Sequence, residues 1–445
     1  MGRGTSAKTK TQPAKALIMN ELQNYKEKAL TLDRLDPLAS FRSRFVVEEE
    51  EMIYLDGNSL GRMPLETEIK MQSVIGQQWS KGLISSWNNH WFDLPQKIAA
   101  KLAKILGAHP DEIFVGDSTS INFYKLAFGA LKMQSGKNTI LTDNLNFPSD
   151  IYLLQGIISQ SFPEHRLQIV QSKDGIAVKQ EDIAHALNEK TALLTLSHVA
   201  FKSAFMYNMS EINELAHQKN TFVLWDLSHA VGSVPIRLNA DSADLAVGCT
   251  YKYLNGGPGA PAFLYVRRDL QEKIVNPIWG WFGHRNPFEF SLDYLPAANS
   301  PQFAAGTPHI LSLSALEPGL DIILEAGINN LREKSRLQSD FLLEMTQQLL
   351  EPLGFTKASP LEAEDRGSHI SLRHPEGWRI SKAMIEPQQG SKSIIPDFRP
   401  PDTIRLGIAP LYNSFTDIYE CVNRLSEIVK HSHYLAYDQT KSAVT

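Results

Sequence analysis

Between residues 94 and 270 the chain alternates short apolar runs with amphipathic helical patterns, and this alternation constrains its fold more than any other feature. The pattern over Leu94–Leu106 predicts a helix with Ile98 and Leu102 on one face and a stop at Gly107. Later helical patterns lie near 120, 182–187 and 210–218, and apolar strands lie at 113–116, 139–142, 192–197 and 221–226. Strands separated by helices pair in parallel, so the sequence predicts an α/β fold with a mostly parallel sheet covered by helices.

The polar residues that end these apolar runs are the first candidates for a functional site. Open sheets of this class bind their ligands beyond the carboxyl ends of the strands. Ser197 follows the apolar run Leu193–Leu196, and Asp226 follows Phe222–Trp225. The strand pattern therefore predicts that Ser197 and Asp226 lie at the ligand-binding edge of the sheet.

From about residue 309 the pattern changes to long amphipathic helices and short strands. Helical patterns cover Ile310–Ala326, Asn330–Glu351 and Phe415–His431, and short strands surround Ile370–Leu372 and Ile404–Ile408. These patterns predict a smaller α+β domain. The expected division is a disordered basic tail at 1–20, a segment at 21–60 that packs with the small domain, a large ligand-binding domain at 61–308 and the small domain at 309–445.

Composition and charge limit the classes of function. The 445 residues include 44 Lys and Arg and 49 Asp and Glu, and the net charge of −5 is too balanced for nucleic acid to be the main partner. No apolar run approaches the roughly 18 residues that span a bilayer, and the basic tail lacks the apolar region of a secretory signal. Cys249 and Cys421 show no metal or disulfide spacing, which indicates a reduced compartment. We therefore expect a cytoplasmic protein with a small-molecule ligand.

Lys252 stands between an apolar strand and the glycine-rich turn Gly256–Gly259. A lysine amine forms an imine readily when desolvation or nearby positive charge lowers its pKa. Glycines let the backbone pass close to a cofactor or to a neighbouring subunit. An exposed lysine before a loop fits the motif equally well, so the motif alone leaves both interpretations open.

Asp226 and His229 precede this lysine, Asp226 by 26 residues. A carboxylate beside a pyridine nitrogen keeps it protonated, so that the ring accepts electrons from a substrate carbanion, and an imidazole can stack on such a ring. By themselves, Asp226 reads as a helix cap and His229 as a satisfied polar residue, because aspartate at strand ends is common. Together with Lys252, the set predicts an enzyme that uses pyridoxal 5′-phosphate.

Three further motifs offer ligand contacts. Residues 116–122, Gly-Asp-Ser-Thr-Ser-Ile-Asn, lead from a strand into a helix whose N–H groups and hydroxyls suit phosphate, although an ordinary N-cap is the alternative. Arg405 is a candidate clamp for a substrate carboxylate, with a surface salt bridge as the alternative. The aromatic residues Trp279, Trp281 and Phe282 either stack on a flat ring or belong to the core or an interface.

Taken together, these motifs resemble those of the kynureninase family, which are fold-type I enzymes that depend on pyridoxal phosphate. The resemblance runs from about Tyr54 to Tyr412, with the motifs in order. They are Tyr54–Gly61, Phe147–Asp150, Trp225–Ala230, Tyr251–Gly259, Gly280–His284, Asp397–Pro401, Arg405 and Pro410–Tyr412. Several ordered motifs over most of the chain are more specific than any one of them.

The resemblance implies a role for each candidate residue. Lys252 would form the Schiff base with the cofactor, Asp226 would pair with its ring nitrogen, and His229 would lie beside the ring. The other cofactor contacts would be Thr119, Ser120, Tyr251 and Trp281 at the phosphate, Phe147 stacked on the ring, Asp150 and Ser197 near its polar edge, and Thr307 from a partner subunit. Arg405 would bind the substrate carboxylate. The family implies a homodimer whose active sites lie at the interface.

The same resemblance implies that L-kynurenine is hydrolysed to anthranilate and L-alanine, in tryptophan catabolism or NAD biosynthesis. Lys252 would take the α-proton, water would add to the γ-carbonyl, and the Cβ–Cγ bond would break, with Tyr251 as a proton donor. General acid–base steps of this kind typically contribute about 10²–10⁴-fold each. Thr307 stands where vertebrate members carry Asn, which favours kynurenine over 3-hydroxykynurenine.

Two rival interpretations remain at this point. Another fold-type I enzyme, such as a cysteine desulfurase-like lyase or a small aminotransferase, also uses Asp and Lys at a similar spacing. A desulfurase needs a reactive cysteine on a mobile loop, whereas Cys249 lies at a strand end and Cys421 in a predicted helix. A non-catalytic binding or scaffold protein is the second rival, and the intact Lys252, Asp226 and Arg405 argue against it.

Overall fold

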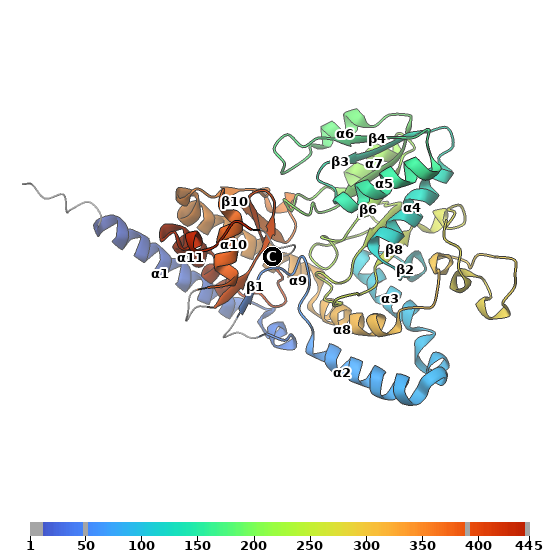
Figure 1. Cartoon of the computed structure of the whole chain (residues 1–445), viewed down its shortest axis with the longest axis horizontal. Coiled ribbons are helices and arrows are strands. Elements are labelled where there is room, and N and C mark those ends of the chain that lie inside the picture. The colour runs from blue at the N-terminus through green and yellow to red at the C-terminus, as the bar shows by residue number, and fades with distance from the viewer. Residues whose placement is uncertain (1–11, 48–51, 388–391, 441–445) are drawn as a thin grey trace, which may run out of the picture.

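A seven-stranded sheet forms the centre of the protein in the computed structural model, which describes residues 12–47, 52–387 and 392–440. The strands lie in the order β2-β8-β7-β6-β5-β3-β4 (Figure 1). Their bounds are β2 (Ile113–Val115), β3 (Thr139–Asp143), β4 (Arg166–Val170), β5 (Thr191–Ser197), β6 (Phe222–Asp226), β7 (Leu245–Gly248) and β8 (Phe263–Val266). The pairs from β4 through β3, β5 and β6 to β7 are parallel, and only β8 and β2 join antiparallel. The predicted mostly parallel sheet is confirmed.

Both faces of this sheet are buried under helices, which explains why its strands read as continuous apolar runs. Neighbouring residues of one strand enter different cores, as Leu193 and Leu194 of β5 do. Helices α4 and α5 pack on one face, and α3, α7 and α8 on the other. The helices are α2 (Leu65–Ser73), α3 (Leu94–Leu106), α4 (Thr119–Met133), α5 (Pro148–Ser161), α6 (Gln180–Ala186), α7 (Met209–His217) and α8 (Ile310–Ala326). Helix α3 ends as predicted, because Gly107 adopts the left-handed conformation with φ +61°.

A second, smaller sheet lies beside the first, in the order β12-β13-β10-β9. Its strands are β9 (Thr356–Lys357), β10 (His369–Arg373), β12 (Asp397–Arg399) and β13 (Thr403–Gly407), and the helices around it are α9 (Ile328–Met345), α10 (Gly377–Ile385) and α11 (Phe415–Lys430). The α9 pattern was expected to continue to Glu351, but the helix loses its regular α-geometry after Met345. Arg405 lies on the central strand β13, paired with both β10 and β12.

The N-terminal segment packs with this smaller sheet. Helix α1 (Gln12–Leu35) contributes Ala29 to the hydrophobic core between the smaller sheet and its helices. Strand β1 (Met52–Tyr54) pairs in parallel with β11 (Ser393–Ile395). Residues 1–11 of the expected disordered tail lie outside the described residues, whereas 12–20 are helical. Helix α8 packs on α2 and α3, and both α3 and α8 contribute to the core of the large sheet. We therefore propose that the division into two domains falls near the start of α9 rather than at residue 309.

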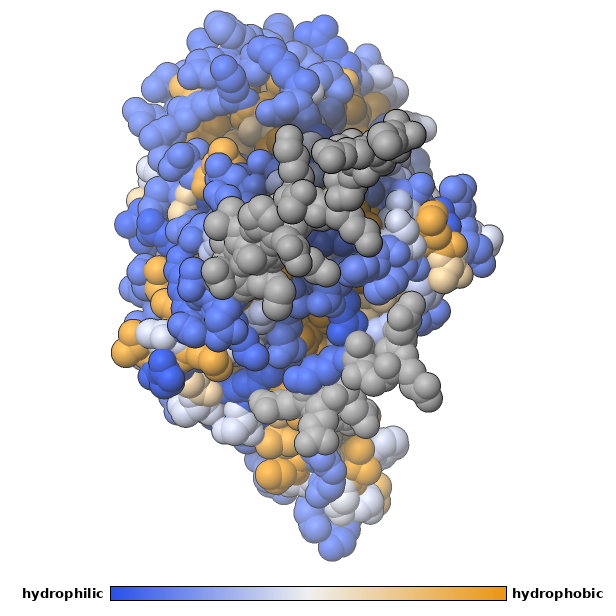
Figure 2. Space-filling model, turned by 90° about the vertical axis from the view of Figure 1, so that its left-hand side faces the viewer, coloured by the Kyte–Doolittle hydropathy of each residue, from blue (hydrophilic) through white to orange (hydrophobic). Residues whose placement is uncertain are grey.

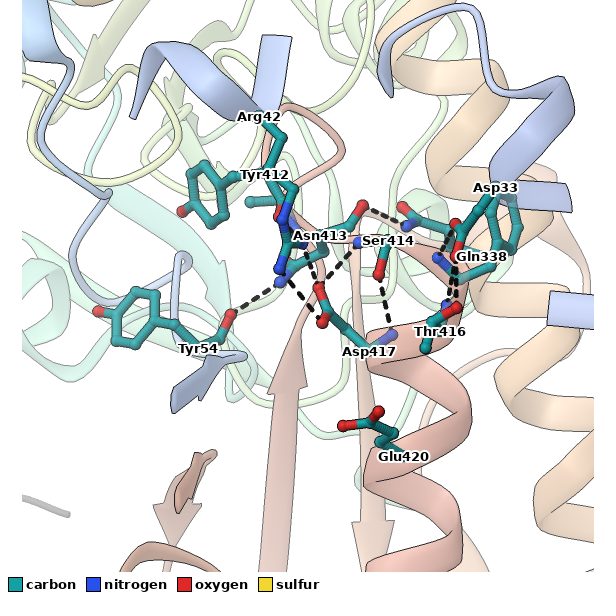
Figure 3. A network of polar contacts seen from close by, with 12 residues as sticks. Asp33, Arg42, Tyr54, Gln338, Tyr412, Asn413, Ser414, Thr416, Asp417 and Glu420 are labelled. Carbon is teal, nitrogen blue, oxygen red and sulfur yellow. Dashed lines mark hydrogen bonds and ion pairs between the residues drawn. The ribbon is translucent and has the colours of Figure 1, made fainter. Parts of the chain in front are cut away.

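A polar network joins the N-terminal segment to the start of α11 (Figure 3). The Asp33 carboxylate accepts hydrogen bonds from the backbone N–H groups of Phe415 at 2.6 Å and Thr416 at 3.0 Å, which caps the helix from outside. Arg42 pairs with Asp417 at 2.5 Å. Asn413 donates to the carbonyl of Tyr54 at 2.9 Å. These bonds hold in place the loop that follows the strand of Arg405.

The face formed by the smaller sheet and α1 is mostly hydrophilic where its atoms are coloured in Figure 2. Large apolar side chains are instead exposed along α2 and the turns after it and in the segment 279–295. Among the described residues, no helix has the length and apolar character needed to cross a membrane.

Candidate active site

Two neighbouring strand ends form the floor of the site. The register of β5 and β6 places Ser197 directly beside Asp226. Both side chains are buried, and Ser197 Oγ donates to Asn146 Oδ1 at 2.6 Å. The backbone N–H of Ser228 donates to Asp226 Oδ1 at 2.8 Å, which orients the carboxylate. The structure thus brings together the two residues that the strand pattern selected.

Lys252 points at the imidazole of His229. The distance between Lys252 Nζ and His229 Nε2 is 2.9 Å. The backbone around the lysine is held by Gly61, whose N–H donates to the carbonyl of Tyr251 at 2.8 Å. A Cβ at Gly61 would lie 2.3 Å from the carbonyl oxygen of Lys252, so only glycine allows this approach. Lys252 is therefore a half-buried amine in a fixed position, and the surface-lysine interpretation is wrong.

Burial sets the protonation of the groups around this amine. Burial raises the pKa of Asp226. Burial also raises the pKa of Asp150, and the nearby carboxylate of Asp226 raises it further. The positive charge of Lys252 acts in the opposite direction on both carboxyls. Burial, together with the charges of Lys252 and Arg405, lowers the pKa of His229 well below its ordinary value. A neutral imidazole nitrogen can accept a hydrogen bond from Nζ of Lys252.

Tyr251 lies beside the buried thiol of Cys249. Burial is the main cause that raises the pKa of both groups, so the phenol and the thiol keep their protons at neutral pH. A protonated phenol suits proton donation. A buried, protonated thiol is a poor nucleophile.

The starts of α4 and α5 meet at residues 116–122, which the sequence predicts to bind phosphate and which we call the phosphate turn. Ser120 Oγ lies 3.1 Å from Ser149 Oγ, which links the first turns of the two helices. Ser118 is the N-cap of α4, and Thr119 is its first residue. Phe147 is the N-cap residue of α5 and is 40% exposed, with its ring perpendicular to that of Phe201. This arrangement gathers hydroxyls and helix N-termini, which favour an anion.

Arg405 is fully buried, with 1% of its side chain exposed, so the alternative of a surface salt bridge is wrong. Nη1 donates to the carbonyl of Phe201 at 2.5 Å, and Nη2 donates to Ser59 Oγ at 3.0 Å. Asp397 Oδ2 lies 2.6 Å from Arg405 Nη2 and 2.9 Å from Arg399 Nε. Two guanidinium groups thus share this one carboxylate, which favours the approach of a further anion.

Asp56 belongs to the same charged group. Burial and the nearby Asp397 raise its pKa to about 6, against the opposing effects of a hydrogen bond from Ser59 and the charges of Arg405 and Arg399. Asn58 also contacts the clamp, because its amide oxygen, in the orientation that satisfies both amide atoms, accepts from Arg405 Nε at 2.8 Å.

Among the described residues, Trp281 and Thr307 make no hydrogen bond or ring contact with Lys252. Trp281 is 41% exposed in a cluster with Phe282, Phe288 and Phe290. Thr307 is exposed and lines a cavity of 610 Å³ whose wall also includes Gly116 and Asp117 of the phosphate turn. That Thr307 serves the site of a partner subunit stays a prediction.

The described residues fit pyridoxal phosphate. Asp150 Oδ2 and His229 Nδ1 are buried polar atoms with no hydrogen-bond partner among the residues that the structure describes. Asp226 is a buried carboxylate with a raised pKa, so a cation beside it would offset the cost of its charge. The protonated ring nitrogen of this cofactor is such a cation, and the phosphate turn suits its anionic end.

Sequence reasoning missed several residues that complete this arrangement. Asp397, Asn58 and Ser59 surround Arg405. All three lie in motifs that support the family resemblance, but sequence reasoning assigned them no role at the site. Asp397 and Arg399 are two residues apart on one strand, and side chains at this spacing lie on the same face of a sheet. This spacing could have predicted that the two side chains lie together. His369, whose ring centroid lies 5.6 Å from that of His229, gave no signal in the sequence.

Comparisons with known proteins give one consistent result. The family model described as the kynureninase C-terminal domain matches residues 331–425. A kynureninase of Pseudomonas fluorescens is 37% identical over 422 residues, which cover 94% of this chain and 98% of that protein. A kynureninase of Burkholderia mallei is 36% identical over 426 residues, covering 94% and 99%.

Solved structures agree on the fold at much lower identity. An apo cysteine desulfurase from Thermococcus onnurineus NA1 is 18% identical, with a TM-score of 0.75 over 88% of this chain and 98% of that chain. A C-DES variant with glycine covalently linked to its PLP cofactor is 19% identical, with a TM-score of 0.75 over 87% and 99%. The predicted fold-type I architecture is confirmed.

The raised pKa of Asp56 predicts how the stability of an Asp56→Asn variant depends on pH. In the folded protein the carboxyl ionises only above about pH 6, whereas in the unfolded chain it ionises near the ordinary value of 3.8. Its folded-state charge is therefore a penalty that is fully present above pH 6 and disappears as the pH falls towards 3.8. Thermal unfolding at pH 8 should show a higher Tm for the variant than for the wild type, with the difference shrinking by pH 4.

Asp402→Asn is the matched control. It also replaces an aspartate by asparagine, but in the turn between β12 and β13, where the Thr403 hydroxyl donates to Asp402 Oδ1. A Tm difference for Asp56→Asn that stays constant from pH 8 to pH 4 would contradict the assignment.

Proposed function

The chain belongs to the kynureninase family, and we propose that it hydrolyses the Cβ–Cγ bond of L-kynurenine to give anthranilate and L-alanine. One observation carries the proposal. Lys252 contacts His229 beyond the end of the strand that carries Asp226, and the charge of the buried Arg405 acts on the same imidazole. That group combines an amine that can move protons with a guanidinium that can hold a carboxylate. Cysteine desulfurases share the fold at under 20% identity, which supports no desulfurase activity here.

Pyridoxal phosphate, when bound, supplies an electron-accepting ring for bonds broken at the substrate carbons next to its amino group. Asp226 would keep the proton on the ring nitrogen. Lys252 would hold the cofactor. The remaining contacts would be Thr119, Ser120, Tyr251 and Trp281 at the phosphate, Phe147 against the ring, and Asp150, Ser197 and His229 around it. The orphaned atoms of Asp150 and His229 support this placement.

Proton movement falls to Lys252 and Tyr251. The neutral imidazole of His229 accepts a hydrogen bond from Lys252 Nζ and so fixes the position of this amine. In its neutral form the amine would take the α-proton. Tyr251, whose pKa burial raises, keeps its proton and would give it to the carbon released by cleavage. Water supplies the oxygen that converts the γ-carbonyl of the substrate into the carboxylate of anthranilate, so the atoms of the reaction balance.

Substrate orientation falls to Arg405. Its charge would hold the α-carboxylate of the amino acid. Asp397 and Ser59 fix the guanidinium from the protein side, which limits the directions in which that carboxylate can bind. Thr307, if supplied by a partner subunit, would contact the cofactor of that subunit and favour kynurenine over 3-hydroxykynurenine.

The first test is the reaction itself. Purified protein supplied with pyridoxal phosphate should convert L-kynurenine to equal amounts of anthranilate and L-alanine, with a higher kcat/KM than for 3-hydroxykynurenine. Lys252→Ala should lower kcat by at least the about 10²–10⁴-fold of a general acid–base step. Anthranilate fluorescence measures the reaction of L-kynurenine, and the fluorescence of 3-hydroxyanthranilate measures that of 3-hydroxykynurenine. Lys219→Ala, which removes a partly exposed lysine that pairs with Glu189, is the control. Ready transamination of other amino acids without anthranilate would overturn the hydrolase assignment.

The second test concerns the carboxylate clamp. Arg405→Lys keeps the charge but loses the planar fork, so KM for L-kynurenine should rise by about tenfold or more, as expected for one lost charge-assisted hydrogen bond. Steady-state kinetics measure the change. Arg373→Lys on the neighbouring strand β10 is the control. Unchanged kcat and KM in Arg405→Lys would remove Arg405 from the site.

A homodimer and a cytoplasmic location complete the proposal. Exposed apolar residues support an interface between two copies: Ile69, Trp79, Leu83, Ile84, Trp279, Phe288, Phe290 and Leu292. The two buried cysteines, and no helix fit to cross a membrane among the described residues, support the location. The net charge of −5 gives nucleic acid no support as a partner.

Sedimentation of the active protein should give twice the chain mass of 49.8 kDa, and Ile84→Glu should shift it towards the monomer because a charge would enter an apolar contact. A fully active species with the mass of one chain would contradict the shared site.

A further inference from the structure

Lys125 is a buried cation that the proposed chemistry does not use. Its side chain is fully buried on α4, and Nζ donates to Asp117 Oδ2 and to the carbonyl of Phe303, both at 2.6 Å. The ammonium also lies 5.2 Å from the centre of the Phe114 ring. A buried ammonium is costly unless its partners are well placed. Three elements converge on Lys125, which makes it a structural centre rather than an ordinary helix lysine.

The main partner of Lys125, Asp117, holds the phosphate turn in an unusual backbone conformation. Asp117 has φ +54°, in the left-handed region that few residues other than glycine adopt, and it directly precedes the N-cap Ser118. Its carbonyl accepts from the N–H of Ala262 at 2.9 Å. Asn122 donates to the carbonyl of Gly116 at 2.9 Å. The ion pair with Lys125 fixes the side chain of this strained residue and so fixes where α4 begins.

The charge of Asp117 would by itself oppose a phosphate. Asp117 directly precedes the N-cap of α4, so an uncompensated charge on its carboxylate would repel a phosphate bound at that helix N-terminus. The ammonium of Lys125, at 2.6 Å from that carboxylate, offsets its charge. Asp117 can therefore shape the turn without weakening anion binding.

The second partner connects the same ammonium to the segment that carries Thr307. Phe303 ends the short helix Ser300–Phe303, and residues 304–309 follow it along the wall of the 610 Å³ cavity that Gly116 and Asp117 also line. One buried charge thus ties the phosphate turn to the segment expected to reach a partner subunit.

We propose that Lys125 is a positioning residue for the cofactor phosphate, which acts by neutralising Asp117 and locking the turn that presents Thr119 and Ser120. The proposal rests on the phosphate-binding role proposed above for those two residues. It concerns binding of the cofactor, so it is tested without turnover.

The test compares Lys125→Met with the wild type in binding of pyridoxal phosphate and of pyridoxal, which lacks the phosphate. The cofactor-free protein is titrated, and the visible absorption that the ligand acquires on bonding to Lys252 reports binding. Lys125→Met should raise the Kd for pyridoxal phosphate by about tenfold or more, on the scale of one charge-assisted hydrogen bond, and should leave the Kd for pyridoxal nearly unchanged. Lys132→Met, an exposed lysine of the same helix, is the matched control and should change neither.

A double variant separates neutralisation from packing. If Lys125 acts by offsetting Asp117, then Asp117→Asn in the Lys125→Met background should recover most of the lost preference for pyridoxal phosphate. The double variant replaces the ion pair by two neutral side chains of similar shape, so it also provides the measurement if Lys125→Met does not fold.

Two outcomes would overturn the inference. One is an equal loss of affinity for both ligands in Lys125→Met, which would indicate a general structural role. The other is a double variant no better than the single one. A wild type that binds pyridoxal as tightly as pyridoxal phosphate would instead show that the proposed phosphate contact itself is wrong, and the inference would fall with it.

Discussion

Parallel pairing of β5 with β6 is the constraint on which the site depends. The register sets Ser197 beside Asp226 at the carboxyl edge of the sheet, and the turn after β6 carries His229 to within 2.9 Å of Lys252. Because this sheet is buried on both faces, its strand ends are among the few places where polar side chains can gather around a ligand. A slip of one residue would turn the Asp226 side chain towards the opposite face of the sheet and dismantle the group.

Charge compensation is the second theme of the structure. The site buries several ionisable groups. Some of them are paired with a group of opposite charge, and others are left for a ligand to compensate. Arg405 shares Asp397 with Arg399, and Lys125 pairs with Asp117. The carboxylates of Asp150 and Asp226 are compensated only in part by Lys252. The cofactor and the substrate carboxylate would therefore complete an electrostatic arrangement that the protein leaves unfinished.

Sequence reasoning predicted the parts of this arrangement that depend on local pattern. The run Leu94–Leu106 and its glycine stop, and the strand ending at Asp226, follow from periodicity and backbone conformation. Lys125 could not be recognised, because a lysine in an amphipathic helix has no sequence mark of burial. Its role appears only when the fold brings Phe303 to the same ammonium. The contribution predicted for Thr307 would depend on a second copy, which no pattern within one chain can place.

Chemical trapping can identify the amine that bonds to the cofactor, which we propose to be Lys252. Borohydride reduction of the protein with bound pyridoxal phosphate would make the bond permanent, and mass spectrometry of the digested protein would locate the modified residue. We expect modification of Lys252 and none of Lys125, whose ammonium is enclosed by Asp117 and Phe303. Modification at any other lysine, with Lys252 unmodified, would contradict it.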